Sequence, residues 1–160
     1  MLSPYRVLDL TDERGQLAGA TLADLGAEVI LVEPPGGSRS RRLPPFVAGR
    51  EGDPEASLWF WSYNRGKRSI SMDLDDPGDR GRFLELVAGA DIVLESDRPG
   101  AMAERGLGYD ELAAVNSEIV VTSISPFGQS GPKADWAATD LTVAAAAMVP
   151  KMTGDEDRAP

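Results

Sequence analysis

The chain has 160 residues, of which 42% are hydrophobic, and carries a formal net charge of −10. This length supports one domain or part of one, and no apolar run reaches the roughly eighteen residues needed to cross a membrane. Cysteine and histidine are absent, which excludes disulfides, Ser-His-Asp and Cys-His catalysis, and most metal sites. The acidic balance disfavours nucleic acid as a partner, because phosphate backbones are bound through Lys and Arg.

The beginning of the chain contains no signal-peptide pattern, so we expect a cytoplasmic protein. Residues 7–10 predict a first strand. Leu17, Leu22 and Leu25 lie near helical spacing, which predicts a helix over residues 16–25. The β-branched run at 28–33 predicts a second strand, and together the three elements form a βαβ unit with a right-handed crossover.

The next part of the chain is less regular. Residues 38–57 carry Pro, Gly and Arg without periodicity, which predicts a long excursion from the core. Trp59, Trp61 and Tyr63 then alternate, a spacing that fits one face of an extended segment or the wall of an acyl pocket. The basic cluster at 65–68 is either a solvated turn ahead of a strand or part of an anion site.

Regular elements return after Asp76, where a second helix begins with an apolar stripe over residues 83–87. Residues 90–95 predict the next strand, followed by a short helix over 109–115. A β-branched run at 119–124 predicts a fourth strand.

The alanine-rich stretch 139–148 predicts a last helix with Thr139 or Asp140 near its amino end. The acidic residues 155–157 are expected to form a solvated loop without a role. Strands that alternate with helices predict an α/β fold with a doubly wound, mainly parallel, Rossmann-like sheet.

An acidic residue at the end of the second strand raises the possibility of an NAD(P)-binding domain. Glu33 occupies the place where such folds bind a ribose hydroxyl. The first turn offers Gly15 and Gly19 but no G-x-G-x-x-G phosphate loop. Glu33 is therefore better explained as a carboxylate that anchors a loop, and the NAD(P) hypothesis remains an alternative.

Several short motifs, taken in order, resemble family III CoA-transferases, the family of formyl-CoA, carnitine and bile-acid CoA-transferases and of 2-methylacyl-CoA racemase. The matching pieces are VLDLT at 7–11, LADLGAEVI at 22–30, VEPPGG at 32–37, NRGKRSI at 64–70, ADIVLE at 90–95, RPG at 98–100 and SISPFG at 123–128. Thr139 stands where the racemase branch has its histidine, which disfavours racemisation.

The resemblance implies transfer of coenzyme A between carboxylic acids through an aspartyl-CoA thioester. A carboxylate suits this chemistry because it acts as both nucleophile and leaving group. Residues 1–160 would form the amino-terminal part of the Rossmann-like CoA-binding large domain, with the catalytic aspartate and the small domain beyond them. The family also implies an interlocked homodimer or a partner subunit, with CoA thioesters as substrates and no prosthetic group or metal.

The resemblance further implies a set of CoA contacts, because the phosphates of CoA need guanidinium, ammonium or backbone N–H donors. Carried over by position, the contacts fall on Arg14, Arg41, Met72, Asp73, Leu74, Asp75, Ser96, Asp97, Arg98, Arg105, Ala137, Thr139 and Asp140. Arg98 follows the carboxyl end of a strand, where open α/β sheets bind ligands. For Arg105 a plain surface charge is the alternative.

Three departures from the family pattern affect this set. Pro34 replaces a loop arginine, for which Arg41 or Arg42 would compensate, Ser96 replaces an asparagine, and Asp75 stands where some members have lysine. The implied catalytic residue is assigned to none of the present positions, which leaves a non-catalytic CoA-binding or assembly subunit as an alternative. The donor and acceptor acids are not readable from the sequence.

Overall fold

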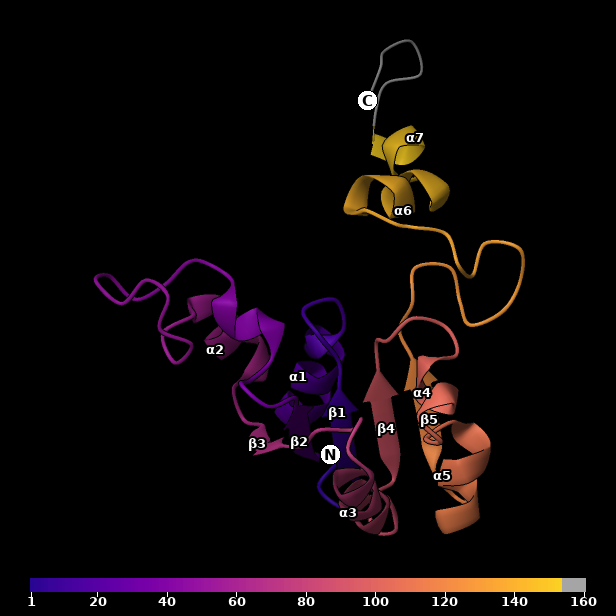
Figure 1. Ribbon diagram of the computed structural model, residues 1–160. Coiled ribbons are helices and arrows are strands. Elements are labelled where there is room, and N and C mark those ends of the chain that lie inside the picture. Colours follow the sequence, from indigo (N-terminus) through magenta and orange to yellow (C-terminus); the bar gives the residue numbers. More distant parts are fainter. Residues whose placement is uncertain (154–160) are drawn as a thin grey trace.

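The computed structural model describes residues 1–153 and contains one five-stranded sheet in the order β3-β2-β1-β4-β5, with every pairing parallel (Figure 1). The strands are β1 (Arg6–Leu10), β2 (Glu28–Glu33), β3 (Arg68–Ser71), β4 (Ile92–Glu95) and β5 (Val120–Ser123). The chain builds outward from β1 to β3 and then returns to the other side of β1 with β4. This reversal makes the sheet doubly wound and confirms the predicted fold class.

Helices cover both faces of the sheet. They are α1 (Gln16–Asp24), α2 (Leu58–Asn64), α3 (Pro77–Val87), α4 (Ala101–Glu104), α5 (Tyr109–Val115), α6 (Asp140–Ala146) and α7 (Val149–Thr153), with a 3-10 turn η1 (Arg39–Arg42). Successive side chains of a strand point to opposite faces. Val7 therefore packs in the cluster under α1, whereas Leu8 packs with Phe83 and Val87 of α3 and Leu112 of α5.

Two elements differ from the sequence-based expectation. Trp59, Trp61 and Tyr63 lie on helix α2, so the predicted extended segment is wrong. Ser57 caps this helix through a hydrogen bond that its side chain accepts from the amide of Phe60, at 3.1 Å. An alternation over so few residues does not distinguish a strand from a short capped helix.

Helix α1 is present, but of the three predicted leucines only Leu22 packs against the core. Leu17 and Leu25 are exposed, whereas Gln16, Gly19 and Ala20 are buried against the sheet. Small residues are needed here because α1 packs closely over the carboxyl end of β1.

The basic cluster at 65–68 divides into exposed and buried members. Arg65 pairs with Asp24 and Arg68 with Glu28 at the surface. Lys67 instead extends into the protein, where its side chain is fully buried and pairs with Asp9 at 2.8 Å. Neither alternative from the sequence describes Lys67, because it is neither solvated nor at an open anion site.

Helices α6 and α7 lie beyond the carboxyl edge of the sheet and are joined to β5 by a long loop (Figure 1). Thr139 caps α6 and forms a capping box with Thr142. No helix within residues 1–153 is long and apolar enough to span a lipid bilayer. The acidic run at 155–157 lies outside the described residues.

Candidate functional site

A cavity of about 680 Å³ opens at the carboxyl edge of the sheet, beside the point between β1 and β4 where the strand order reverses. Ligands of open α/β sheets bind at such a switch point. The cavity is lined by Arg14, Asp97, Arg98, Pro99, Ile124, Ser125, Pro126, Ala134, Asp135, Trp136, Ala137, Ala138, Thr139, Asp140 and Val143. These residues come from the loops after β1, β4 and β5 and from the start of α6.

The turn after β1 is held by carboxylates. Asp9, buried at the end of the strand, accepts hydrogen bonds from the amide and the hydroxyl of Thr11, at 3.0 and 2.6 Å. The amide of Asp12 donates to Ser96 Oγ at 2.8 Å, and Ser96 Oγ donates to the Asp12 carboxylate at 3.0 Å. Residues 84 positions apart are thus joined directly, and the loops after β1 and β4 form one wall of the cavity.

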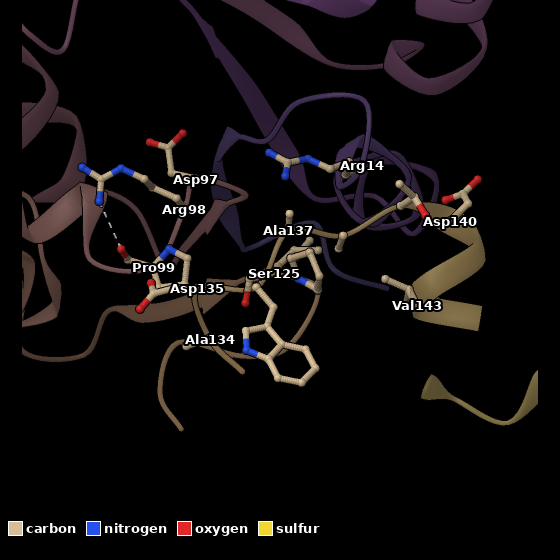
Figure 2. A pocket seen from close by; sticks show the side chains of 15 residues that line it. Arg14, Asp97, Arg98, Pro99, Ser125, Ala134, Asp135, Ala137, Asp140 and Val143 are labelled. Carbon is tan, nitrogen blue, oxygen red and sulfur yellow. Dashed lines mark hydrogen bonds between the residues drawn. The ribbon is translucent and has the colours of Figure 1, made fainter. Parts of the chain in front are cut away.

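Arg14 is fixed on this wall by two partners. Its Nε lies 2.9 Å and its Nη2 2.5 Å from Asp12 Oδ2, and Nη2 also donates to the main-chain oxygen of Ser96 at 2.7 Å. Burial alone would raise the pKa of Asp12, but the hydrogen bonds from Arg14 and Ser96 outweigh it and lower that pKa. The hydrogen bond to Asp12 raises the pKa of Arg14 in turn. Arg14 is therefore held in one orientation at the cavity wall, as an ion pair with Asp12 (Figure 2).

A second cavity of about 420 Å³ shares Asp97 and Arg98 with the first. Its other charged residues are Asp75, Glu104 and Arg105. Arg105 Nε lies 2.8 Å from Asp75 Oδ1, and its Nη1 also pairs with Asp97. Hydrogen bonding to Asp75 is the main reason that the pKa of Arg105 is raised.

The far wall of the first cavity is largely apolar and comes from residues 134–143. Trp136 is 59% exposed and meets Phe127 edge to face, with 6.2 Å between the ring centroids. Figure 2 shows Arg14 between the Asp97 and Arg98 side and the Asp140 end of α6. Ser125, on the loop after β5, also lines the cavity, and its Oγ is buried without a hydrogen-bond partner in residues 1–153.

The structure brings most of the sequence-predicted contacts to these two cavities. The first is lined by Arg14, Asp97, Arg98, Ala137, Thr139 and Asp140, and the second by Asp75, Asp97, Arg98 and Arg105. Ser96 lies directly behind the first through its hydrogen bonds to Asp12 and Arg14. Their role in binding CoA stays a prediction.

Three other predicted contacts lie outside both cavities. Met72 and Leu74 pack against the hydrophobic core under α3, and the amide of Asp73 donates to the Asp79 carboxylate at 2.8 Å. In this structure these residues support the segment that leads from β3 to α3. They stay predictions as CoA contacts.

Arg41 also lies away from the cavities, at the end of β2. Its guanidinium forms a two-pronged contact with Glu33, at 2.6 and 2.8 Å, and stacks over the ring of Phe60 at 3.9 Å. Glu33 also accepts from the amide of Ser38 at 2.8 Å and from the hydroxyl of Ser69. Glu33 thus anchors the excursion, and its carboxylate is already engaged where an NAD(P) domain would bind ribose.

The sequence interpretation missed Asp12, Ser125 and Trp136. Asp12 and Ser125 follow strands that were predicted, so the rule that ligands bind beyond strand carboxyl ends could have identified both. Trp136 carried no such signal, because it lies in an irregular loop. No group of three Asp or Glu residues within 1–153 is arranged to hold a metal ion.

Comparison with known proteins confirms the predicted family and fold. The family model described as CoA-transferase family III matches residues 2–160. A subunit of succinyl-CoA:(R)-benzylsuccinate CoA-transferase from Thauera aromatica is 43% identical over 143 residues, which cover 89% of this chain and 35% of the relative. Acetyl-CoA:oxalate CoA-transferase from Acetobacter aceti is 43% identical over 156 residues, covering 96% and 39%.

A crystal structure of a CAIB/BAIF family protein from Brucella suis matches with a TM-score of 0.87 and 37% identity, over 99% of this chain and 42% of that one. The chain therefore spans about two fifths of the length of these relatives.

Proposed function

The chain belongs to CoA-transferase family III, and from this premise we propose that it forms the CoA-binding part of an enzyme that transfers coenzyme A between carboxylic acids. The observation that carries the proposal is the pair of adjoining cavities at the switch point of the sheet, with Arg14, Arg98 and Arg105 around them. A cavity of 680 Å³ is within the usual range of small-molecule sites.

The two cavities suit the two ends of a CoA thioester. We assign the phosphates to the second cavity, where Arg98 and Arg105 supply guanidinium forks that match phosphate oxygens. The thioester end then extends into the first cavity, along the apolar wall that includes Trp136 and Val143. Asp97 and Arg98 line both cavities and mark the passage between them.

The proposed reaction uses a carboxylate nucleophile. It attacks the thioester carbonyl, which expels the CoA thiolate and leaves a mixed anhydride. The thiolate then attacks the enzyme carbonyl of that anhydride, which releases the free acid and forms an enzyme-CoA thioester. The acceptor carboxylate reverses both steps with a new acyl group. We assign the nucleophile to an aspartate in the part of the family's chains that residues 1–160 do not cover. We propose that the assembly is a homodimer or a pair with a partner subunit.

Arg14 supports a narrower substrate class. Its guanidinium is fixed by Asp12 and faces the cavity that we assign to the acyl group. The two relatives from Thauera aromatica and Acetobacter aceti are both named for transfer to dicarboxylic acids, (R)-benzylsuccinate and oxalate. We therefore propose that the acyl group carries a second, free carboxylate that pairs with Arg14.

The test of CoA binding is calorimetric titration of the protein with CoA. We expect Arg98→Met and Arg105→Met each to weaken binding about tenfold or more, since charge-assisted bonds to phosphate contribute about 1.5–3 kcal/mol. Arg82→Met is the matched control, because Arg82 is an exposed arginine of α3 that pairs only locally with Asp79. Unchanged affinity in both site variants, or a preference for NAD(P)H over CoA, would overturn the assignment.

The substrate class is tested by comparing two thioesters. Arg14→Met should weaken binding of succinyl-CoA about tenfold while leaving that of acetyl-CoA unchanged, because only succinyl-CoA carries a free carboxylate. An equal loss for both ligands would contradict the assignment of Arg14 to the acyl carboxylate.

A further inference from the structure

The second cavity contains more carboxylates than guanidinium groups. Arg98 and Arg105 face Asp75, Asp97 and Glu104, so the formal charge of the cavity is negative. An anionic ligand that enters here meets repulsion unless a carboxylate moves away.

The carboxylates are the present partners of both arginines. Arg98 Nη1 lies 2.9 Å from Glu104 Oε1, and Arg98 Nη2 pairs with the other oxygen of the same carboxylate. Arg105 Nε lies 2.8 Å from Asp75 Oδ1. Each guanidinium thus directs to a neighbouring carboxylate the same N–H groups that a phosphate would use.

The pairs differ in exposure. The side chains of Arg98 and Glu104 are 66% and 60% exposed, and that of Asp75 is 75% exposed. Exposed ion pairs contribute little to stability, so little free energy opposes their separation. Asp97 is less exposed, and its amide is tied to the buried carboxylate of Glu95 at 2.7 Å.

We propose that Glu104 and Asp75 are internal competitors for the anionic ligand, which hold Arg98 and Arg105 in the free protein and are displaced by its phosphate oxygens. Asp97 stays in place, because its backbone is anchored to Glu95, and keeps Arg105 oriented. This inference rests on the proposed function, since the phosphates of CoA are the displacing groups. Glu104 and Asp75 then limit affinity for CoA and contribute little to folding.

The mechanism predicts that neutralising neighbouring carboxylates changes CoA affinity in opposite directions. Removing the charge of a competitor frees a guanidinium, so Glu104→Gln and Asp75→Asn should each tighten CoA binding about two- to fivefold, the factor that corresponds to one exposed pair. Removing the charge of Asp97 loosens Arg105 instead, so Asp97→Asn should weaken binding. Carboxylates that merely orient the arginines would give weaker binding in all three variants.

The experiment is calorimetric titration of the wild-type protein and these variants with CoA, in about 0.15 M salt, where distant charges are screened. Glu118→Gln is the matched control: it removes one exposed carboxylate just before β5, at the opposite end of that strand from the site, and its affinity should equal the wild type. Wild-type binding without tightening in Glu104→Gln and Asp75→Asn overturns the competitor inference alone. Absence of CoA binding by the wild type overturns the proposed function and this inference together.

Discussion

The ammonium group of Lys67 lies 2.8 Å from the carboxylate of Asp9, and both side chains are fully buried. Lys67 Nζ also donates to the main-chain oxygen of Gln16 and to the side-chain oxygen of Asn64, each at 2.9 Å. Burial lowers the pKa of Lys67, and attraction to Asp9 offsets part of this effect. The pair joins β1, the start of α1 and the segment ahead of β3.

Loss of the ammonium group should destabilise the fold strongly. Lys67→Met leaves the Asp9 carboxylate buried without its counter-charge, so we expect the free energy of unfolding to fall by about 3–5 kcal/mol in denaturant titrations. Arg65→Met, which removes the exposed pair with Asp24 and an exposed hydrogen bond to the main-chain oxygen of Ser62, should cost less than about 1 kcal/mol. Equal losses of unfolding free energy in the two variants would show that the buried pair stabilises the fold no more than the exposed pair does.

Glycine is required where α1 crosses this pair. A Cβ added at Gly19 would lie 2.1 Å from Asp9 Oδ2 and 3.0 Å from Lys67 Nζ. Gly19→Ala should therefore lower the free energy of unfolding by about 1–3 kcal/mol, through overpacking. Gly81→Ala on α3 is the matched control, because a Cβ there has no neighbour within 4 Å. It should raise stability by about 0.4–1 kcal/mol, and a loss at Gly81 would refute the steric explanation.

The Glu33 carboxylate should make stability depend on acid pH. Burial would raise its pKa, but hydrogen bonds from Arg41, Ser38 and Ser69 outweigh this and hold the pKa below its ordinary value of 4.5. The stabilisation is therefore fully present above pH 4.5 and is lost as pH falls through the lower folded-state pKa.

We expect denaturant titrations between about pH 3 and 6 to show this loss in the wild-type protein. The loss should shrink in Glu33→Gln, which is also less stable at neutral pH because Arg41 loses its forked partner. Glu118→Gln should keep the wild-type slope. A wild-type slope in Glu33→Gln would assign the acid dependence to other carboxylates.

Trp136 should report occupation of the first cavity. It is 59% exposed in the cavity wall, so a bound CoA thioester would change its surroundings and its fluorescence. We expect acetyl-CoA to shift tryptophan emission in the wild type and most of the shift to disappear in Trp136→Phe, which retains Trp59 and Trp61 on α2 as references. A shift that persists in Trp136→Phe would place the ligand elsewhere.

The fold class was predictable because its signals are local. The β-branched runs at 28–33 and 119–124 need little context to be recognised as strands, and the apolar stripe of α3 appears directly as buried Phe83 and Val87. Strand β3 carries a weaker signal in the sequence, because only Ile70 of its four residues is apolar.

The site was predictable only in part, because its charges depend on pairing across long sequence separations. Arg98 and Arg105 were identified as candidates, but the sequence does not show that Glu104 and Asp75 occupy them. The family pattern suggests Arg41 as a ligand contact that compensates for Pro34. The structure instead pairs Arg41 with Glu33, the last residue of β2. The sequence pattern groups Lys67 with the basic residues around it, whereas the structure buries the Lys67 side chain completely.

The buried side chain of Gln16, the first residue of α1, connects three stretches of the chain. Gln16 Nε2 donates to the main-chain oxygen of Thr11 and to Ser38 Oγ, both at 3.2 Å, and its Oε1 accepts from Asn64 Nδ2 at 2.9 Å. The bonds to Ser38 and Asn64 form only when residues 38–57 and α2 pack against α1. The turn after β1 and the excursion should therefore open and exchange their amide hydrogens as one cooperative unit rather than as two independent loops.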